Sequence, residues 1–201
     1  EEEEGHKMIL IKNNNEIGLI KESSSMVFDV LNSLTELVIP GASPKELDLF
    51  AENFIKNNGG VPAFKGYMGF PSTLCISINE EVVHGIPSER LLKNGDIVSI
   101  DCGVLKNGFY GDSARTYPVG KISKEVKNLL DVTKKSLSLG IKSAKSGGRL
   151  SDIGYAIQTY VEKNGFSIVR DLVGHGIGEN LHEEPQIPNY GIKGEGVVLK
   201  E

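Results

Sequence analysis

The amino-acid sequence predicts an α+β fold in which two similar halves surround one sheet. Apolar residues recur at helical spacing in four segments, two strand-like runs meet at Asn107-Gly108, and two helical segments resemble each other. With 39% hydrophobic and 24% charged residues among 201, the composition is that of a globular chain with one sizeable core. No linker interrupts it, so we expect a single domain over residues 9–201, preceded by a tail over residues 1–8.

Two helices are predicted in the N-terminal part. Asn13 followed by Glu16 resembles a capping box, and apolar residues at helical spacing continue to Pro40-Gly41. The second helix opens at 43–46, which reads Ser-Pro-Lys-Glu, and stops at the Asn- and Gly-rich residues 57–60. The elements expected after it are a loop over 61–73, strands over 74–78, 97–105 and 109–119, helices over 123–143 and 149–164, and a strand over 166–173.

Two of the predicted helices match each other when Asn58-Gly59 is aligned with Asn164-Gly165. Shared core spacing alone could produce this match, and the other explanation is a fold with two related halves. The aligned pairs are Leu47 with Ile153, Ala51 with Ile157, Phe54 with Tyr160, and Ile55 with Val161.

The helix over 123–143 is expected to face inward with Val126, Leu129, Leu130, Thr133, Leu137 and Ile141.

Charge and cysteine content exclude several classes of function. The formal net charge of −5 becomes −1 without Glu1 to Glu4, a run that we interpret as a solvated tail or a remnant of an expression tag. A nearly neutral body gives no electrostatic reason to bind nucleic acid or an anionic membrane. No apolar run approaches the ~20 residues of a membrane span. Cys75 and Cys102 lack zinc-type spacing and suit free thiols in the cytoplasm.

The predicted hairpin carries two acidic residues, Asp101 and Asp112. A two-residue turn at Asn107-Gly108 pairs residue 101 with 114 and makes Asp112 its diagonal neighbour, whereas a shifted register sets the two acids directly opposite. Either register leaves the carboxylates roughly 5–8 Å apart on one face, where they repel each other. A cation between them would remove this repulsion, and the alternative is an exposed face with two solvated acids.

Three histidines could join these carboxylates. His175 lies among glycines in Gly174–Gly178, which permit close backbone approach and unusual dihedral angles, and His182 follows seven residues later. His84 comes after a strand-like run and before a tight turn. Each of them alone could be an ordinary loop histidine, but together with the acids they favour imidazole and carboxylate ligation of one or two cations. Motifs for a serine nucleophile or a phosphate loop are absent from the sequence.

These motifs closely resemble those of bacterial type I methionine aminopeptidases, which belong to the pita-bread metallopeptidases. The resemblance runs from about residue 8 to the end of the chain and keeps the motif order. It implies the pita-bread α+β fold, with halves related by pseudo-symmetry. The matching segments are Cys75–Glu80, His84–Pro87, Gly95–Asp101, Gly111–Asp112, Gly174–Gly178 and His182–Pro185.

The resemblance implies removal of the initiator methionine from new polypeptides when the second residue is small. Asp101 would be the bidentate ligand of one metal, Asp112 the bridging ligand, and His175 a ligand of the other metal. His84 would hydrogen-bond the scissile amide, and His182 would stabilise the carbonyl oxygen. The cofactors would be two divalent ions, which could be Co, Mn, Fe, Zn or Ni.

By the same resemblance, Tyr67, Phe70, Cys75 and Leu181 would form the wall of a methionine pocket, with Phe64 near its mouth. Ordinary core packing is the alternative explanation for these apolar residues. The expected partners are nascent polypeptide N-termini, with ribosome association left open, and the expected state is a cytoplasmic monomer that binds neither nucleic acid nor membrane.

The family's site has two further glutamate ligands on strands beyond the segment 197–201, and Glu183, Glu184 and Glu201 match neither of them. We therefore expect this chain to hold three of five ligands and to lack the final strands, as a fragment, an incomplete record or a natural truncation. Two other functions stay open: an X-Pro aminopeptidase of the same fold, and a pita-bread binding module without metals. Retention of Asp101, Asp112 and His175 argues against the binding module.

Overall fold

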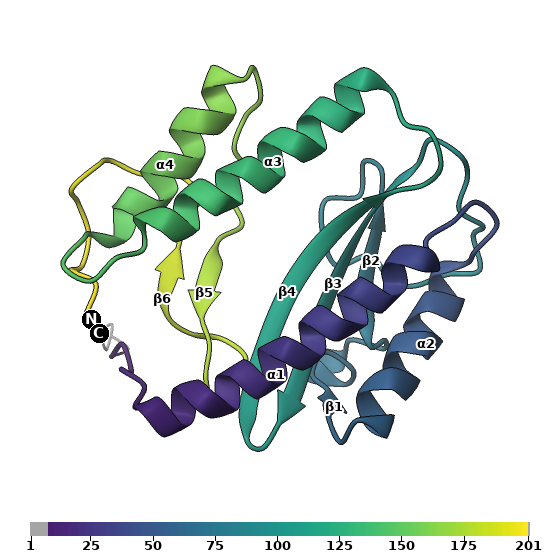
Figure 1. Cartoon of the computed structure of the whole chain (residues 1–201), viewed down its shortest axis with the longest axis horizontal. Coiled ribbons are helices and arrows are strands. Elements are labelled where there is room, and N and C mark those ends of the chain that lie inside the picture. The colour runs from purple at the N-terminus through teal and green to yellow at the C-terminus, as the bar shows by residue number, and fades with distance from the viewer. Residues whose placement is uncertain (1–7, 201) are drawn as a thin grey trace, which may run out of the picture. The chain divides into compact units, whose positions relative to one another are not determined.

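The computed structural model describes residues 8–200, which form two compact units (Figure 1). The sheet unit consists of residues 12–123 and 177–181. The helical unit consists of the described residues up to 11, residues 124–176, and residues from 182 onward. Most of the predicted acidic tail, residues 1–7, lies outside the described residues, and the assignment of residues 9–201 to one catalytic domain stays a prediction.

The sheet unit is built around the hairpin of β3 (Ile97–Lys106) and β4 (Phe109–Pro118). β2 (Leu74–Ile78) and the two-residue β1 (Val61–Pro62) both pair antiparallel with β3. β1 and a 3-10 turn at Tyr67–Gly69 lie within the segment that the sequence predicted as a loop.

A two-residue turn sets the register of the hairpin. Asn107 has φ of +51° and Gly108 has φ of +83°, the left-handed conformations that a tight hairpin turn requires. Asp101 therefore pairs with Ala114, and Gly103 pairs with Asp112. This is the first of the two predicted registers, and the register that sets Asp101 directly opposite Asp112 is wrong.

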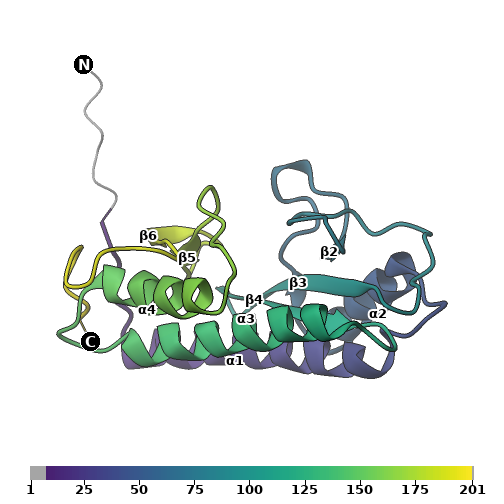
Figure 2. The ribbon, with the colours of Figure 1, turned by 90° about the horizontal axis from the view of Figure 1, so that it is seen from above.

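The apolar face of the sheet packs against α1 (Asn14–Ser33) and α2 (Pro44–Asn57), and α1 runs along β3 and β4 (Figure 2). The capping box predicted at Asn13 is present, with the Asn13 side chain accepting from the Glu16 amide. The helix start predicted at 43–46 is also a capping box, in which the Ser43 side chain accepts from the Glu46 amide. Residues of α1, α2, β2 and β3 share one core, in which Val30, Ile55, Ile100, Cys102 and Val104 are fully buried.

The helical unit contains α3 (Lys124–Ser143), α4 (Leu150–Lys163), and the short pair β5 (Gly174–Gly176) and β6 (Glu183–Ile187). The predicted inward face of α3 is wrong from Thr133 onward, because Thr133, Leu137 and Ile141 are exposed. The buried positions are Val132, Ser136 and Gly140. α4 approaches so closely that a Cβ atom on Gly140 would lie 2.8 Å from Ile157 Cδ1, so small residues form the contact.

The predicted strand over 166–173 is also wrong. Among the described residues that follow α4, strand pairing begins at Gly174, in β5. Phe166 and Ile168 pack instead on the cluster around Val161. Their apolar character therefore reflects packing against α4 and not membership of a sheet ladder.

The match between α2 and α4 is structural. Asn58 Nδ2 donates to the Phe54 carbonyl at 2.8 Å, and Asn164 Nδ2 donates to the Tyr160 carbonyl at 2.7 Å. Gly59 and Gly165 follow with φ of +74° and +82°. The helices share their stop signals and two buried positions, Ala51 with Ile157 and Ile55 with Val161, as expected for two related halves.

The described residues include no helix that is both long enough and apolar enough to cross a membrane.

Gly111 lets α1 approach β4, and this contact can be tested. A Cβ atom there would lie 2.6 Å from the Ser23 backbone, while Ser23 Oγ donates to the Phe109 carbonyl at 2.8 Å. Gly111→Ala should lower the free energy of unfolding in urea by about 1–3 kcal/mol. Gly18→Ala is the matched control, because Gly18 lies within α1 with nothing within 4 Å, and should stabilise the protein by up to ~1 kcal/mol. Equal stability of the two variants would contradict this contact.

Candidate functional site

Asp101 and Asp112 lie on the face of the hairpin opposite the main core. Ile100, Cys102 and Val104 point toward the helices with no exposed area, so alternation places Asp101 on the other face. Asp112 shares that face because it pairs with Gly103. The two carboxyl groups hydrogen-bond to each other, and both residues are partly buried. The structure therefore brings the predicted pair together, and these are not two fully solvated acids.

The electrostatics of this pair fit a bound cation. Burial raises the pKa of Asp112, and the negative charge of Asp101 and the hydrogen bond to it raise this pKa further. Two ionised carboxylates in this position repel, and carboxylate oxygens are suitable ligands for divalent ions. Over residues 8–200, no three His, Cys, Asp or Glu side chains form a complete metal-binding group. The hairpin thus supplies an acidic pair that would be relieved by a divalent cation.

An apolar cluster lies beside the acidic pair. Cys75 pairs with Asp101 across β2 and β3, and it packs with Phe64 and Leu181. Phe70 is partly buried against the same cluster. Four of the five residues predicted for the methionine pocket are therefore together. The fifth, Tyr67, lies in the 3-10 turn with 40% of its surface exposed, and its place in the wall stays a prediction.

Cys75 serves this cluster as a neutral apolar group. Burial raises the pKa of its thiol to about 12, and the charges of Asp101 and Asp112 contribute. A thiol is nucleophilic only as the thiolate, so Cys75 is not an activated nucleophile at neutral pH.

Gly103 makes room for the pocket. A Cβ atom on Gly103 would lie 2.4 Å from the Phe64 ring, so this position lets the ring lie against β3. Gly103 was not among the site residues predicted from the sequence. A glycine inside a strand-like run marks a site of close approach and was the available signal.

His84 lies in the loop after β2, which ends at Ile78. It is exposed and has φ of +59°, a conformation that non-glycine residues rarely adopt. The following residue holds it there: the Gly85 carbonyl accepts from the Ile76 amide at 2.8 Å, and the Gly85 amide donates to Ser77 Oγ at 3.2 Å. A Cβ atom on Gly85 would lie 2.1 Å from the Ile76 carbonyl oxygen, so this approach requires glycine. This role of Gly85 was not predicted from the sequence.

His175 and His182 meet in the helical unit, with ring centroids 4.3 Å apart and ring planes tilted by 53°. His175 Nδ1 lies 2.9 Å from the Gly176 carbonyl oxygen. A carbonyl accepts only from a protonated nitrogen, so the neutral ring carries its proton on Nδ1 and its lone pair on Nε2. Nε2 is therefore the nitrogen suited to a metal.

The glycines around His175 permit close backbone approach, as expected, but they do not adopt the unusual dihedral angles that were also expected. A Cβ atom on Gly176 would lie 2.3 Å from the Glu184 carbonyl oxygen, so β6 excludes any larger residue there. In the segment Gly174–Gly178, none of the three glycines has a positive φ.

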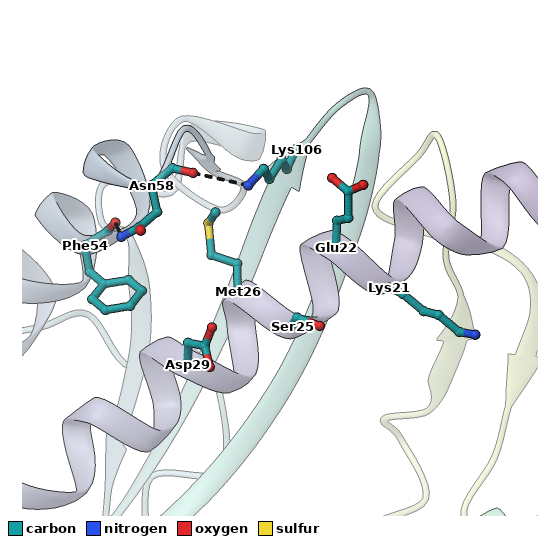
Figure 3. A pocket seen from close by; sticks show the side chains of 8 residues that line it. All are labelled: Lys21, Glu22, Ser25, Met26, Asp29, Phe54, Asn58 and Lys106. Carbon is teal, nitrogen blue, oxygen red and sulfur yellow. Dashed lines mark hydrogen bonds between the residues drawn. The ribbon is translucent and has the colours of Figure 1, made fainter.

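A cavity of about 490 Å³ lies on the opposite face of the sheet unit, between α1, the end of α2 and β3 (Figure 3). Lys106 reaches across its upper side and donates to the Asn58 carbonyl at 3.3 Å (Figure 3). None of the predicted site residues lines it, so the size of this cavity does not identify the chemical site. The lining residues are Lys21, Glu22, Ser25, Met26, Asp29, Phe54, Asn58 and Lys106.

Comparisons with known proteins agree with a site that contains the acidic pair, the histidines and the apolar cluster. The model of metallopeptidase family M24 matches residues 18–201. Methionine aminopeptidase 1 of Bacillus subtilis (strain 168) is 54% identical over 193 residues, which cover 96% of this chain and 78% of that protein. The crystal structure of methionine aminopeptidase from Rickettsia prowazekii has a TM-score of 0.95 at 42% identity, covering 96% of this chain and 78% of that one. A prolidase from Pyrococcus horikoshii OT3 has a TM-score of 0.82 at 25% identity, covering 95% and 53%.

The acidic pair predicts a pH dependence of stability after divalent ions have been removed with a chelator. The pKa of Asp112 is raised in the folded state, so the protonated carboxyl group favours folding. This contribution to the free energy of unfolding is fully present below pH 3.8, the ordinary pKa of the group, and is lost as pH rises through the raised pKa. Asp112→Asn should therefore stabilise the metal-free protein at about pH 8 by an amount on the order of 2 kcal/mol, and by much less at about pH 4. Urea denaturation at both pH values tests this, and a difference independent of pH would contradict it.

Proposed function

Because the chain belongs to metallopeptidase family M24, we propose that the face of the sheet unit carrying Asp101 and Asp112 is where it hydrolyses peptides. Its fold is the pita-bread fold of that family, and its activity is that of a methionine aminopeptidase, a metal-dependent exopeptidase that removes N-terminal methionine. The observation that carries the location is the acidic pair beside the apolar cluster of Phe64, Cys75 and Leu181.

The other functions considered from the sequence are not favoured. The prolidase likeness is at 25% identity, whereas the methionine aminopeptidase of B. subtilis is 54% identical. A binding module that had lost its metals would have no need for a half-buried acidic pair, which costs stability without a cation.

As an M24 metallopeptidase, the enzyme uses divalent metal. We propose two ions, from the set Co, Mn, Fe, Zn and Ni, with Asp101, Asp112 and His175 as their ligands in this chain. Bound ions of this kind activate water and polarise the scissile carbonyl. The carboxylates supply the negative charge that holds such ions, and the Nδ1 proton of His175, facing the Gly176 carbonyl, directs its Nε2 lone pair toward ligation.

The proposed catalytic histidines act on the peptide directly. His84 would donate a hydrogen bond to the scissile amide and assist departure of the amine, and its exposed position on a loop anchored at Gly85 supports this role. His182 would donate to the carbonyl oxygen as negative charge develops on it. Its contact with the His175 ring supports a place beside a metal ligand.

The apolar cluster would bind the methionine side chain. Phe64, Phe70, Cys75 and Leu181 offer an apolar environment with no ionised group of their own, because the Cys75 thiol stays protonated. Tyr67 would close the wall from the 3-10 turn. Phe64 and His84 would limit the size of the second residue.

The setting of the enzyme is also a proposal. Its substrates would be nascent polypeptide N-termini, met in the cytoplasm and in part at the ribosome, and the enzyme would act as a monomer. Both cysteines are free and buried, and burial raises the pKa of Cys102 as it does that of Cys75, so neither is a reactive surface thiol.

The first test of this function is substrate selectivity. With Mn or Co added, the protein should release methionine from Met-Gly-Met, Met-Ala and Met-Ser peptides, because the apolar cluster accepts methionine and only small second residues fit. Asp112→Asn should abolish release and keep the fold, as monitored by circular dichroism. Comparable kcat/KM on X-Pro peptides without methionine would support the prolidase alternative instead.

The second test concerns His84. His84→Ala should lower kcat by about 10²–10⁴-fold, as expected for a group that donates a proton or hydrogen bond in the transition state. Metal content, measured by atomic emission, should match that of the wild type. Loss of metal with unchanged activity per bound metal would show that His84 is a ligand instead.

A further inference from the structure

The proposed methionine pocket is formed largely by one loop, residues 63–74, which carries Phe64, Tyr67 and Phe70 and ends at Leu74, the first residue of β2. Loops of this kind need external anchors to hold a binding surface in one shape. The Ala63 amide at the start of the loop donates to the Gly103 carbonyl of β3 at 2.9 Å. Two further anchors come from α2, and neither the sequence motifs nor the pocket residues point to them.

The first anchor is Asp48 of α2. Its Oδ1 accepts a hydrogen bond from the Leu74 amide at 2.7 Å, and the Thr73 amide also donates to this carboxylate. Thr73 and Leu74 have no exposed surface, so water cannot replace this acceptor. Burial raises the pKa of Asp48, while the two amides and the nearby charge of Lys65 lower it. The end of the loop is thereby fixed to the helix.

The second anchor is Glu52, one helical turn further along α2. Glu52 Oε2 lies 2.8 Å from Lys65 Nζ in the loop, and Oε1 lies 2.6 Å from Lys56 Nζ in the same helix. The Glu52 side chain is only 13% exposed, which strengthens an ion pair relative to a solvated one. The beginning of the loop is thereby fixed as well.

Between the two anchors the loop is closed by its own backbone. The Gly66 amide donates to the Phe70 carbonyl at 2.7 Å, the Phe70 amide to the Tyr67 carbonyl at 2.9 Å, and the Tyr67 amide to the Phe64 carbonyl at 3.0 Å. A loop with this internal bonding shifts as a unit when an anchor is released. Phe64 and Phe70 would then move relative to Cys75 on β2.

We propose that Asp48 and Glu52 are positioning residues that determine specificity, because they clamp the 63–74 loop so that Phe64 and Phe70 fit a methionine side chain. This inference rests on the proposed function. Neither acid lies on the face of the sheet that carries Asp101 and Asp112, so the clamp should act on substrate binding and selectivity more than on the chemical step.

Lys65 and Lys56 provide a matched pair of variants, since both contact Glu52 but only Lys65 belongs to the loop. Lys65→Gln should raise KM for Met-Gly-Met about three- to tenfold, with kcat changed less than about twofold. The preference for methionine over norvaline at the first position should fall by a similar factor, because a displaced wall discriminates less between side chains. Lys56→Gln should leave KM and the preference for methionine unchanged. Lys65→Arg keeps the positive charge and should keep both at their wild-type values.

Asp48→Ala tests the other anchor, because it removes both acceptor oxygens, with the same expected rise in KM and loss of selectivity. If Asp48→Ala does not fold, Lys65→Gln and its controls decide the question, because Lys65 is at the surface. The clamp is overturned if the wild type releases methionine while Lys65→Gln keeps the wild-type KM and selectivity, or if Lys56→Gln has the same effect as Lys65→Gln. A wild type that releases no methionine from any of the peptides overturns the proposed function, and the specificity role falls with it.

Discussion

The register of the β3–β4 hairpin is the constraint on which the rest of the structure depends. The turn at Asn107-Gly108 pairs residue 101 with 114, and this choice decides which side chains face the helices. Ile100, Cys102 and Val104 enter the core, while Asp101 and Asp112 are left on the other face. A slip of one residue would bury an acid under α1 and expose the apolar row. The same register that stabilises the fold therefore assembles the acidic pair.

Features fixed by neighbouring residues could be predicted from the sequence. The capping box at Asn13, the helix start at Ser43 and the hairpin turn depend on contacts within a few residues, and all three were predicted. The buried face of α3 and the segment 166–173 depend on what packs against them. Apolar periodicity identified Leu137 as inward, but close contact with α4 selects the small residues Ser136 and Gly140.

In the candidate site too, features set by residues near in sequence could be predicted, and features set by distant segments could not. The acidic pair and the meeting of His175 with His182 followed from motif spacing, and the structure places each pair together within its unit. The supporting contacts could not be found in that way. Gly85 and Gly103 are needed because β2 and the Phe64 ring come within 2.1 Å and 2.4 Å of where their Cβ atoms would be. Such limits arise from segments distant in the sequence, and spacing alone does not indicate them.

α2 links the stability of the fold to the shape of the site. Leu47, Ala51 and Ile55 recur at intervals of four and pack into the main core. Asp48 and Glu52 recur at the same interval and form the adjacent stripe. Once the apolar stripe docks, the rotation of the helix is fixed, and Asp48 and Glu52 face the 63–74 loop. The core residues thus determine the position of the clamp without touching it. A substitution such as Ala51 to a larger residue would turn the helix and alter the pocket through Asp48 and Glu52, even though Ala51 itself is fully buried on the opposite side of the sheet from the acidic pair.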